Sequence, residues 1–147
     1  MKNTDMARSY VKQAEERIYH ASEAIKRGSY PYVIRQCQEA VELLLKAALR
    51  LVGVEPPKWH DVGVILRRES GRFPRWLRED IPIMARYSRR LRREREPSMY
   101  GDEESGMTPE EMYDKGDAEE ALEMASFVRS RVKRLLEEYE EVSREKS

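Results

Sequence analysis

The sequence has few of the residues on which metal and disulfide chemistry depends. Its 147 residues include one cysteine, Cys37, and two histidines, His20 and His60. A single thiol excludes an internal disulfide framework and a cysteine-rich zinc site. The histidines belong to no His-x3-His or Glu-x-x-His pair, the spacings that place two metal ligands on one helix face. We therefore expect no metal or other cofactor.

Long apolar runs, glycine-rich phosphate loops and internal repeats are also missing. Without an apolar run of about 18 residues the chain has no candidate membrane span. The N-terminus leads straight into an amphipathic pattern and offers no signal-peptide core. These features predict a cytoplasmic protein with no membrane partner. No domain linker interrupts the chain, so residues 1–147 are expected to form a single domain.

Charge is abundant but uneven along the chain. Charged residues make up 38% of the sequence, and the formal net charge is zero. Residues 67–95 hold eleven arginines against four acidic residues, whereas residues 102–123 hold ten acidic residues and one lysine. Arginine outnumbers lysine twenty to eight, and the chain has one asparagine and three glutamines. This composition is typical of proteins from thermophiles and excludes no activity.

Apolar residues recur at three- and four-residue steps over most of the chain, which predicts helices. Long helices are expected at about 4–27, 31–52 and 82–96. A further one begins at the Thr108–Glu111 capping box, restarts near Asp117 and continues to about Val142. Asp61 is a good cap for a short helix, and Pro97 is expected to end the fourth. The predicted fold class is all-α, an antiparallel up-and-down bundle of four long helices with one or two short extra helices.

The second predicted helix has the broadest apolar face and is expected to lie at the centre of the bundle. Cys37 falls on that face, four residues from both Val33 and Val41, so we expect a buried structural thiol rather than a nucleophile. His20 is expected at the surface of the first helix.

Two segments resemble motifs of the HEPN domain family, and the resemblance extends over nearly the whole chain. They are the His60-Asp61 entry to the third helix and the stretch from Arg93 to Asp102. The start of the second helix and its apolar run fit the same family, in the order Tyr30-Pro31-Tyr32-Val33 and Gln38 to Ala47. The resemblance implies a helical bundle that forms a homodimer. It also implies a small nucleotidyltransferase as partner, in a toxin–antitoxin-like pair.

Many members of that family cleave RNA without a metal, through an arginine, four to six variable residues and a histidine, often followed by x-Tyr. In that chemistry the arginine holds the scissile phosphate and the histidine moves the proton of the 2′-hydroxyl. Arg93 takes the arginine position, Ser98 the histidine position and Tyr100 the tyrosine position. Serine has no group that exchanges a proton near neutral pH. Glu94 adds a negative charge beside the motif arginine.

The resemblance therefore predicts a catalytically degenerate domain that binds RNA, a nucleotide or a protein partner, rather than an enzyme. The alternative is an active metal-independent RNase that uses Arg93 with Tyr100, Ser98 or His60. In relatives paired with a nucleotidyltransferase the motif tyrosine accepts AMP, so Tyr100 is a candidate for modification if its hydroxyl is exposed. Otherwise Tyr100 packs against the core.

Four arginines of the fourth predicted helix share one face and form what we call the arginine stripe: Arg86, Arg89, Arg90 and Arg93. The stripe has two interpretations. It binds phosphates of RNA or a nucleotide, with an affinity that falls as salt rises. Or it pairs with the acidic segment 102–123 of the same chain or of a partner chain, which the zero net charge favours.

Overall fold

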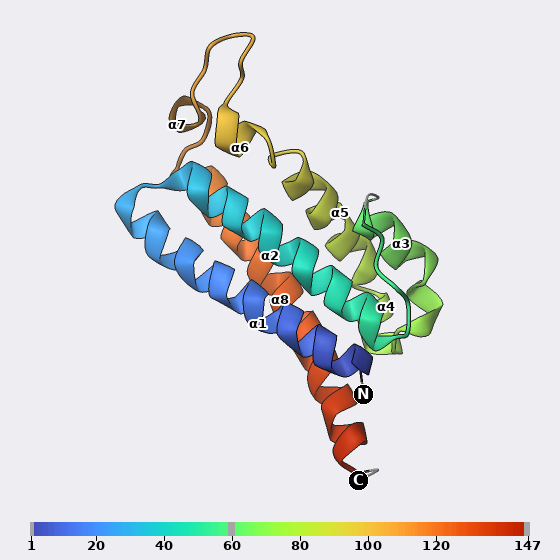
Figure 1. Cartoon of the computed structure of the whole chain (residues 1–147). Coiled ribbons are helices and arrows are strands. Elements are labelled where there is room, and N and C mark those ends of the chain that lie inside the picture. Colours follow the sequence, from blue (N-terminus) through green and yellow to red (C-terminus); the bar gives the residue numbers. More distant parts are fainter. Residues whose placement is uncertain (1, 59–60, 146–147) are drawn as a thin grey trace.

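The computed structural model describes residues 2–58 and 61–145, and these residues form helices joined by turns, with no strand among them (Figure 1). The all-helical fold class is thus confirmed. In chain order the helices are α1 (Lys2–Ala24), the short 3-10 helix η1 (Ile25–Arg27), α2 (Tyr30–Leu51), α3 (Val62–Arg68), the 3-10 helix η2 (Ser70–Arg72), α4 (Arg75–Arg78), α5 (Ile81–Arg92), α6 (Pro97–Tyr100), α7 (Pro109–Met112) and α8 (Lys115–Glu145).

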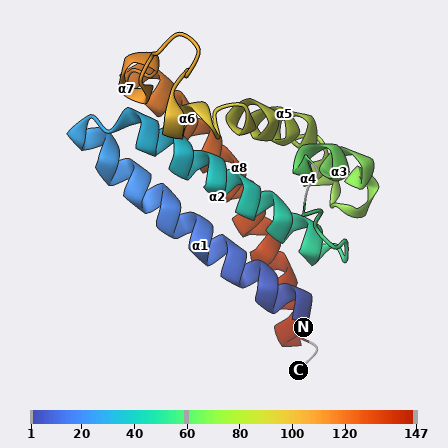
Figure 2. The same cartoon turned by 45° about the horizontal axis from the view of Figure 1, so that its top comes forward.

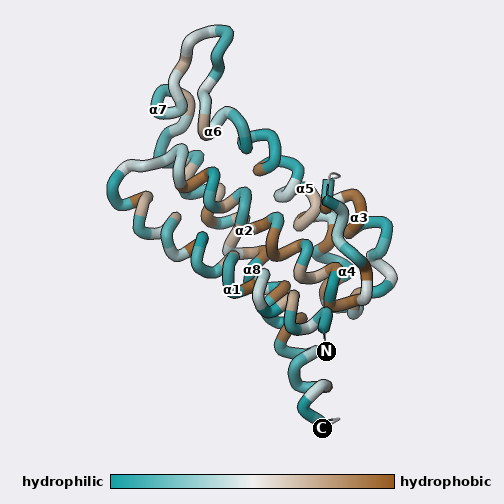
Figure 3. Tube along the Cα trace, in the orientation of Figure 1, coloured by the Kyte–Doolittle hydropathy of each residue, from teal (hydrophilic) through white to brown (hydrophobic). Residues whose placement is uncertain are grey.

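Helix α2 is the centre of the bundle, as its apolar face predicts. It packs against the long helices α1 and α8, and α1 and α8 also contact one another. Its remaining neighbours are α3, α5, α6 and α7 (Figure 2). Apolar and polar residues alternate along the long helices (Figure 3), and the apolar residues supply most of the buried core. Cys37 is completely buried on this helix, and burial raises the pKa of its thiol to about 12. The thiol is structural, as expected.

Helices α3, α4 and α5 form a smaller group beside the long helices. Helix α3 packs on α5, and both contact α2. Leu77 of α4 and Ile81 of α5 are buried, whereas Trp76 is half-buried and donates a hydrogen bond from its indole nitrogen to Glu138 of α8. The segment 71–82, which three helix-breaking residues interrupt, is therefore anchored to the bundle at several points.

The helix starts were predicted more accurately than the helix ends. Asp61 caps α3 by accepting a hydrogen bond from the backbone N–H of Gly63, and Thr108 with Glu111 forms the expected capping box of α7. The expected fourth helix is shorter than 82–96, because α5 ends at Arg92. The expectation that Pro97 ends it is wrong, since Pro97 begins α6. Proline lacks an N–H and has a helical φ, so it suits the first turn of a helix.

Every helix within the described ranges falls short of the length and apolar character that crossing a membrane would need.

Candidate functional site

The candidate motif lies where the chain passes from α5 to α6. Residues 93–96 form a turn that continues the helical path loosely, with the backbone N–H of Glu94 bonded to the carbonyl of Leu91 and that of Ser98 bonded to the carbonyl of Glu94. Arg93 is exposed at the start of this turn. The turn therefore presents Arg93 to solvent and leads directly to Ser98.

Ser98 is buried, whereas Arg93 is exposed to solvent. Its residue is only 6% exposed, and its hydroxyl donates a hydrogen bond to the backbone carbonyl of Arg95 at 3.2 Å. No histidine, carboxylate or lysine among the described residues hydrogen-bonds to the hydroxyl. The side chain at the position of the motif histidine thus stabilises the turn, and within residues 2–58 and 61–145 no base is hydrogen-bonded to it.

The same carbonyl is held from the other side by Arg35 of α2. The Nη1 of Arg35 donates to the oxygen of Arg95 at 2.6 Å, and its Nε donates to Glu39 at 2.9 Å. Glu39 also accepts a hydrogen bond from Arg17 of α1, again at 2.9 Å. This network, which we call the turn clamp, joins α1, α2 and the turn. Sequence reasoning missed it, although Arg35 and Glu39 have the spacing of a helical ion pair.

Glu39 is the charged centre of the turn clamp. Burial by itself raises the pKa of the Glu39 carboxyl, but the hydrogen bonds from Arg17 and Arg35 outweigh burial and bring the pKa below its usual 4.5. A carboxyl group whose pKa is lower in the folded than in the unfolded protein stabilises the fold. This stabilisation is complete at pH values above the unfolded-state pKa, and it is lost as the pH falls through the folded-state pKa. The clamp is therefore strongest near neutral pH and weak in acid.

Replacing Glu39 with glutamine is expected to lower the free energy of unfolding by about 1 kcal/mol near pH 7, because two charge-assisted hydrogen bonds weaken. The difference from wild type should shrink as the pH falls below 4.5 and through the lowered pKa of the folded Glu39 carboxyl, where the wild-type carboxylate becomes protonated as well. Denaturant unfolding at pH 7 and at a series of acidic pH values measures this. Glu42→Gln on the same helix is the control, because Glu42 has no ion pair within residues 2–58 and 61–145. A difference that persists unchanged in acid would contradict the expectation.

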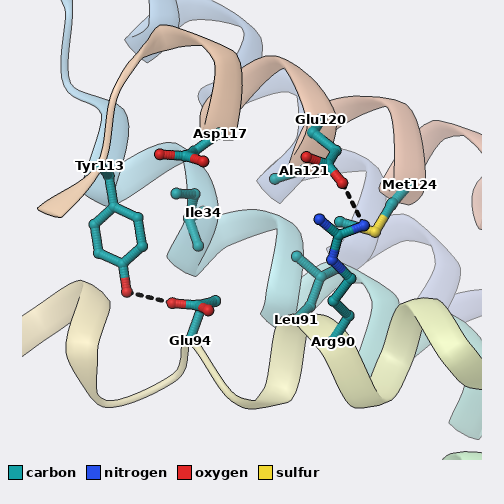
Figure 4. Close-up of a pocket in the computed structure, with 9 residues that line it drawn as sticks. All are labelled: Ile34, Arg90, Leu91, Glu94, Tyr113, Asp117, Glu120, Ala121 and Met124. Carbon is teal, nitrogen blue, oxygen red and sulfur yellow. Dashed lines mark hydrogen bonds and ion pairs between the residues drawn. The ribbon is translucent and has the colours of Figure 1, made fainter.

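Glu94 is turned toward a small cavity between α5, α8 and the segment before α8. Its carboxylate accepts a hydrogen bond from the hydroxyl of Tyr113 (Figure 4). Burial, and then the bond to Glu94, raises the pKa of the Tyr113 hydroxyl well above its usual value. In the same cavity Arg90 forms an ion pair with Glu120. The Glu94 carboxylate therefore has a partner of its own and fastens the turn to the segment between α7 and α8.

The arginine stripe is exposed, but its members differ in their partners. Arg90 pairs with Glu120 of the acidic segment, as the pairing interpretation predicts for one arginine. Arg86, Arg89 and Arg93 have no carboxylate within ion-pairing distance anywhere in the part of the chain that the structure describes. Among the residues that the structure describes, pairing within one chain therefore leaves three guanidinium groups of the stripe without a charged partner.

Tyr100 ends α6 and is 61% exposed, so the interpretation that it packs against the core is wrong. Met99 beside it is 50% exposed. Helix α6 is only four residues long, so it is too short to turn both side chains into the bundle. The Tyr100 side chain is thus exposed, as the modification hypothesis requires. His60, the remaining candidate, lies outside the described residues.

His20 is exposed on α1 and hydrogen-bonds to Glu16, as a surface histidine does. Across the described ranges no three histidine, cysteine or acidic side chains gather in an arrangement that could hold a metal ion. The described part of the candidate site therefore consists of arginine, serine and tyrosine side chains.

Comparison with known proteins gives a family and a fold. Residues 7–135 match the family described as HEPN domain. Among solved structures, the chain is similar to the crystal structure of TT1696 from Thermus thermophilus, with 24% sequence identity and a TM-score of 0.67. That match covers 88% of this chain and 97% of the other, and at this identity it shows a common fold alone. No curated protein matches the chain.

Proposed function

The chain belongs to the HEPN domain family, and we propose that it is a catalytically degenerate member that binds the phosphates of RNA or a nucleotide. The observation that carries this proposal is the state of Ser98. At the position of the motif histidine stands a buried hydroxyl whose proton is donated to the carbonyl of Arg95. A general base that works near neutral pH has to gain and lose a proton in that pH range, and a serine hydroxyl does not.

The three unpaired arginines of the stripe support phosphate binding. A guanidinium group donates two parallel hydrogen bonds to a phosphate, and Arg86, Arg89 and Arg93 have no competing carboxylate among the described residues. The turn clamp and the Glu94–Tyr113 bond hold the turn that begins at Arg93 from two sides. A site whose hydrogen-bond donors are already fixed loses less conformational entropy on binding a phosphate than a site with mobile donors.

The proposed partners follow the family. The chain forms a homodimer and engages a small nucleotidyltransferase, in a toxin–antitoxin-like pair. Tyr100 supports this pairing, because an exposed hydroxyl at the end of α6 is accessible to an enzyme that transfers AMP. The partner is identified by a Gly-Ser followed by an Asp-x-Asp in the neighbouring reading frame.

Incubating the purified protein with structured and unstructured RNA in EDTA tests whether it cleaves or only binds. We expect intact RNA at high protein concentration, together with a mobility shift that falls steeply as salt rises. Cleavage that disappears in Arg93→Ala would instead establish the alternative, an active metal-independent RNase that uses Arg93 with Tyr100, Ser98 or His60. The absence of both cleavage and binding would overturn the proposal.

Removing the unpaired arginines should weaken RNA binding in a measurable way. We expect the triple variant Arg86→Ala, Arg89→Ala, Arg93→Ala to lose roughly tenfold in affinity near physiological salt. The slope of log affinity against log salt should become shallower by about 2 for single-stranded RNA, because up to three phosphate contacts are lost. The matched control replaces Arg68, Arg75 and Arg78, which are also exposed and have no carboxylate partner in the described ranges. Equal effects of the two triple variants would show that RNA binds without preference for the stripe.

A further inference from the structure

Arg90 differs from the other members of the arginine stripe because it lies on the side of α5 that faces α8. It lines the small cavity between the two helices, and its side chain reaches toward Glu120 of α8 (Figure 4). The guanidinium group and the Glu120 carboxylate form an ion pair. The other three arginines of the stripe are exposed and have no carboxylate partner in the described part of the chain. One of the four charges of the stripe is thus neutralised by α8.

The surroundings of Arg90 are also acidic. Glu94 and Asp117 line the same cavity as Arg90 and Glu120. In Figure 4 these carboxylates and the Arg90 guanidinium all lie along the junction of α5, α8 and the segment before α8. A phosphate that approached Arg90 at this junction would meet three carboxylates, and like charges repel. The ion pair and the cavity therefore both disfavour a phosphate at Arg90.

The Arg90–Glu120 pair is weak in energy but close at hand. The two side chains are 57% and 42% exposed, so water screens their attraction. Glu120 belongs to the same chain, however, and an intramolecular partner competes at an effective concentration far above that of RNA in solution. Because both side chains are largely exposed, a substitution at Glu120 changes the state of Arg90 with little effect on the fold.

We propose that Glu120 is a specificity-determining residue of the phosphate site, because it withholds Arg90 from RNA. The inference rests on the proposed phosphate binding and states which arginines carry it. RNA contacts Arg86, Arg89 and Arg93, while Arg90 remains paired with α8. Attraction between arginines and the phosphate backbone does not depend on the base sequence. Withholding one arginine weakens this attraction, so ligands that make further contacts are favoured over nucleic acid in general.

The variant Glu120→Gln frees Arg90 and tests the inference in an RNA-binding assay. It should bind single-stranded RNA about threefold more tightly than wild type near physiological salt. The slope of log affinity against log salt should become steeper by about 0.7, because one more phosphate is contacted. Glu119→Gln is the matched control, since the neighbouring Glu119 is exposed and has no ion pair within residues 2–58 and 61–145. It removes the same charge from α8 but should leave the slope unchanged.

The double variant Arg90→Ala, Glu120→Gln removes the whole ion pair and keeps the net charge of the protein. It should bind RNA with the affinity and the salt slope of wild type, because the three remaining arginines are the ones that RNA contacts. Weaker binding with a slope shallower by about 0.7 would show that Arg90 already contacts RNA in the wild type. That result would overturn the inference, as would an equal response to Glu120→Gln and Glu119→Gln.

The assay separates this inference from the proposed function. If neither wild type nor Glu120→Gln binds RNA, phosphate binding and the inference both fail. If wild type binds RNA and Glu120→Gln binds it no more tightly, only the inference fails. Circular dichroism and analytical ultracentrifugation should show that all variants are folded and have the mass of wild type, so that a change in affinity reports on the stripe alone.

Discussion

Replacing Leu44 with alanine is expected to lower the free energy of unfolding by about 3 to 4 kcal/mol, within the range for buried leucines. Leu44 is completely buried in the middle of α2. Because α2 is packed by α1, α8 and several shorter helices, the surrounding chain has little freedom to close the cavity. The lost transfer free energy and the cavity therefore add.

Leu43→Ala is the matched control, since the same atoms are removed from the neighbouring residue of the same helix. Leu43 is only partly buried against the core, so a loss of about 1 to 2 kcal/mol is expected. Denaturant unfolding at one fixed protein concentration measures both variants, because association would otherwise change the apparent stability. Similar losses at the two positions would mean that α2 is not the packed centre of the bundle.

Replacing Gly101 with alanine is expected to cost about 3 kcal/mol, from backbone strain and a close contact together. Gly101 has φ 71° and ψ −155°, a conformation that is essentially restricted to glycine. A Cβ at this position would also collide with the backbone carbonyl oxygen of Met107. That oxygen accepts the hydrogen bond from the N–H of Asp102 that closes the loop, so it has no freedom to withdraw.

Gly106→Ala separates the two causes at the other end of the same loop. Gly106 also has a positive φ, 77°, but a Cβ there would meet no atom within 4 Å. We therefore expect a loss of only about 1 kcal/mol for this variant, the cost of the left-handed backbone alone. Thermal and denaturant unfolding compare the two variants. Equal, small losses would show that the loop moves aside at little cost.

Features that depend on residues close together in the chain could be predicted. The apolar spacing placed the long helices, and the caps at Asp61 and Thr108 follow from side chains that reach backbone groups two or three residues away. The burial of Cys37 followed from its place on the apolar face of α2. Pro97 was misjudged because proline has the same local signature after a helix end and at a helix start.

The environment of the candidate site could not be predicted. The motif positions Arg93, Ser98 and Tyr100 were found through a family resemblance, but nothing local indicates that Ser98 is buried or that Tyr100 is exposed. Arg35 and the carbonyl that it binds are 60 residues apart. The partner of that arginine is a backbone atom, which carries no signal in the sequence.

The sequence by itself determined that the chain is helical, that α2 is central and that the motif position which needs an imidazole holds a serine. Helical periodicity, capping and residue identity are local properties, so they can be read without coordinates. Only the tertiary structure decided which charges find partners. Ion pairs form between side chains brought together by helix packing, and this packing pairs Arg90 with Glu120 while leaving Arg86, Arg89 and Arg93 unpaired within the described residues.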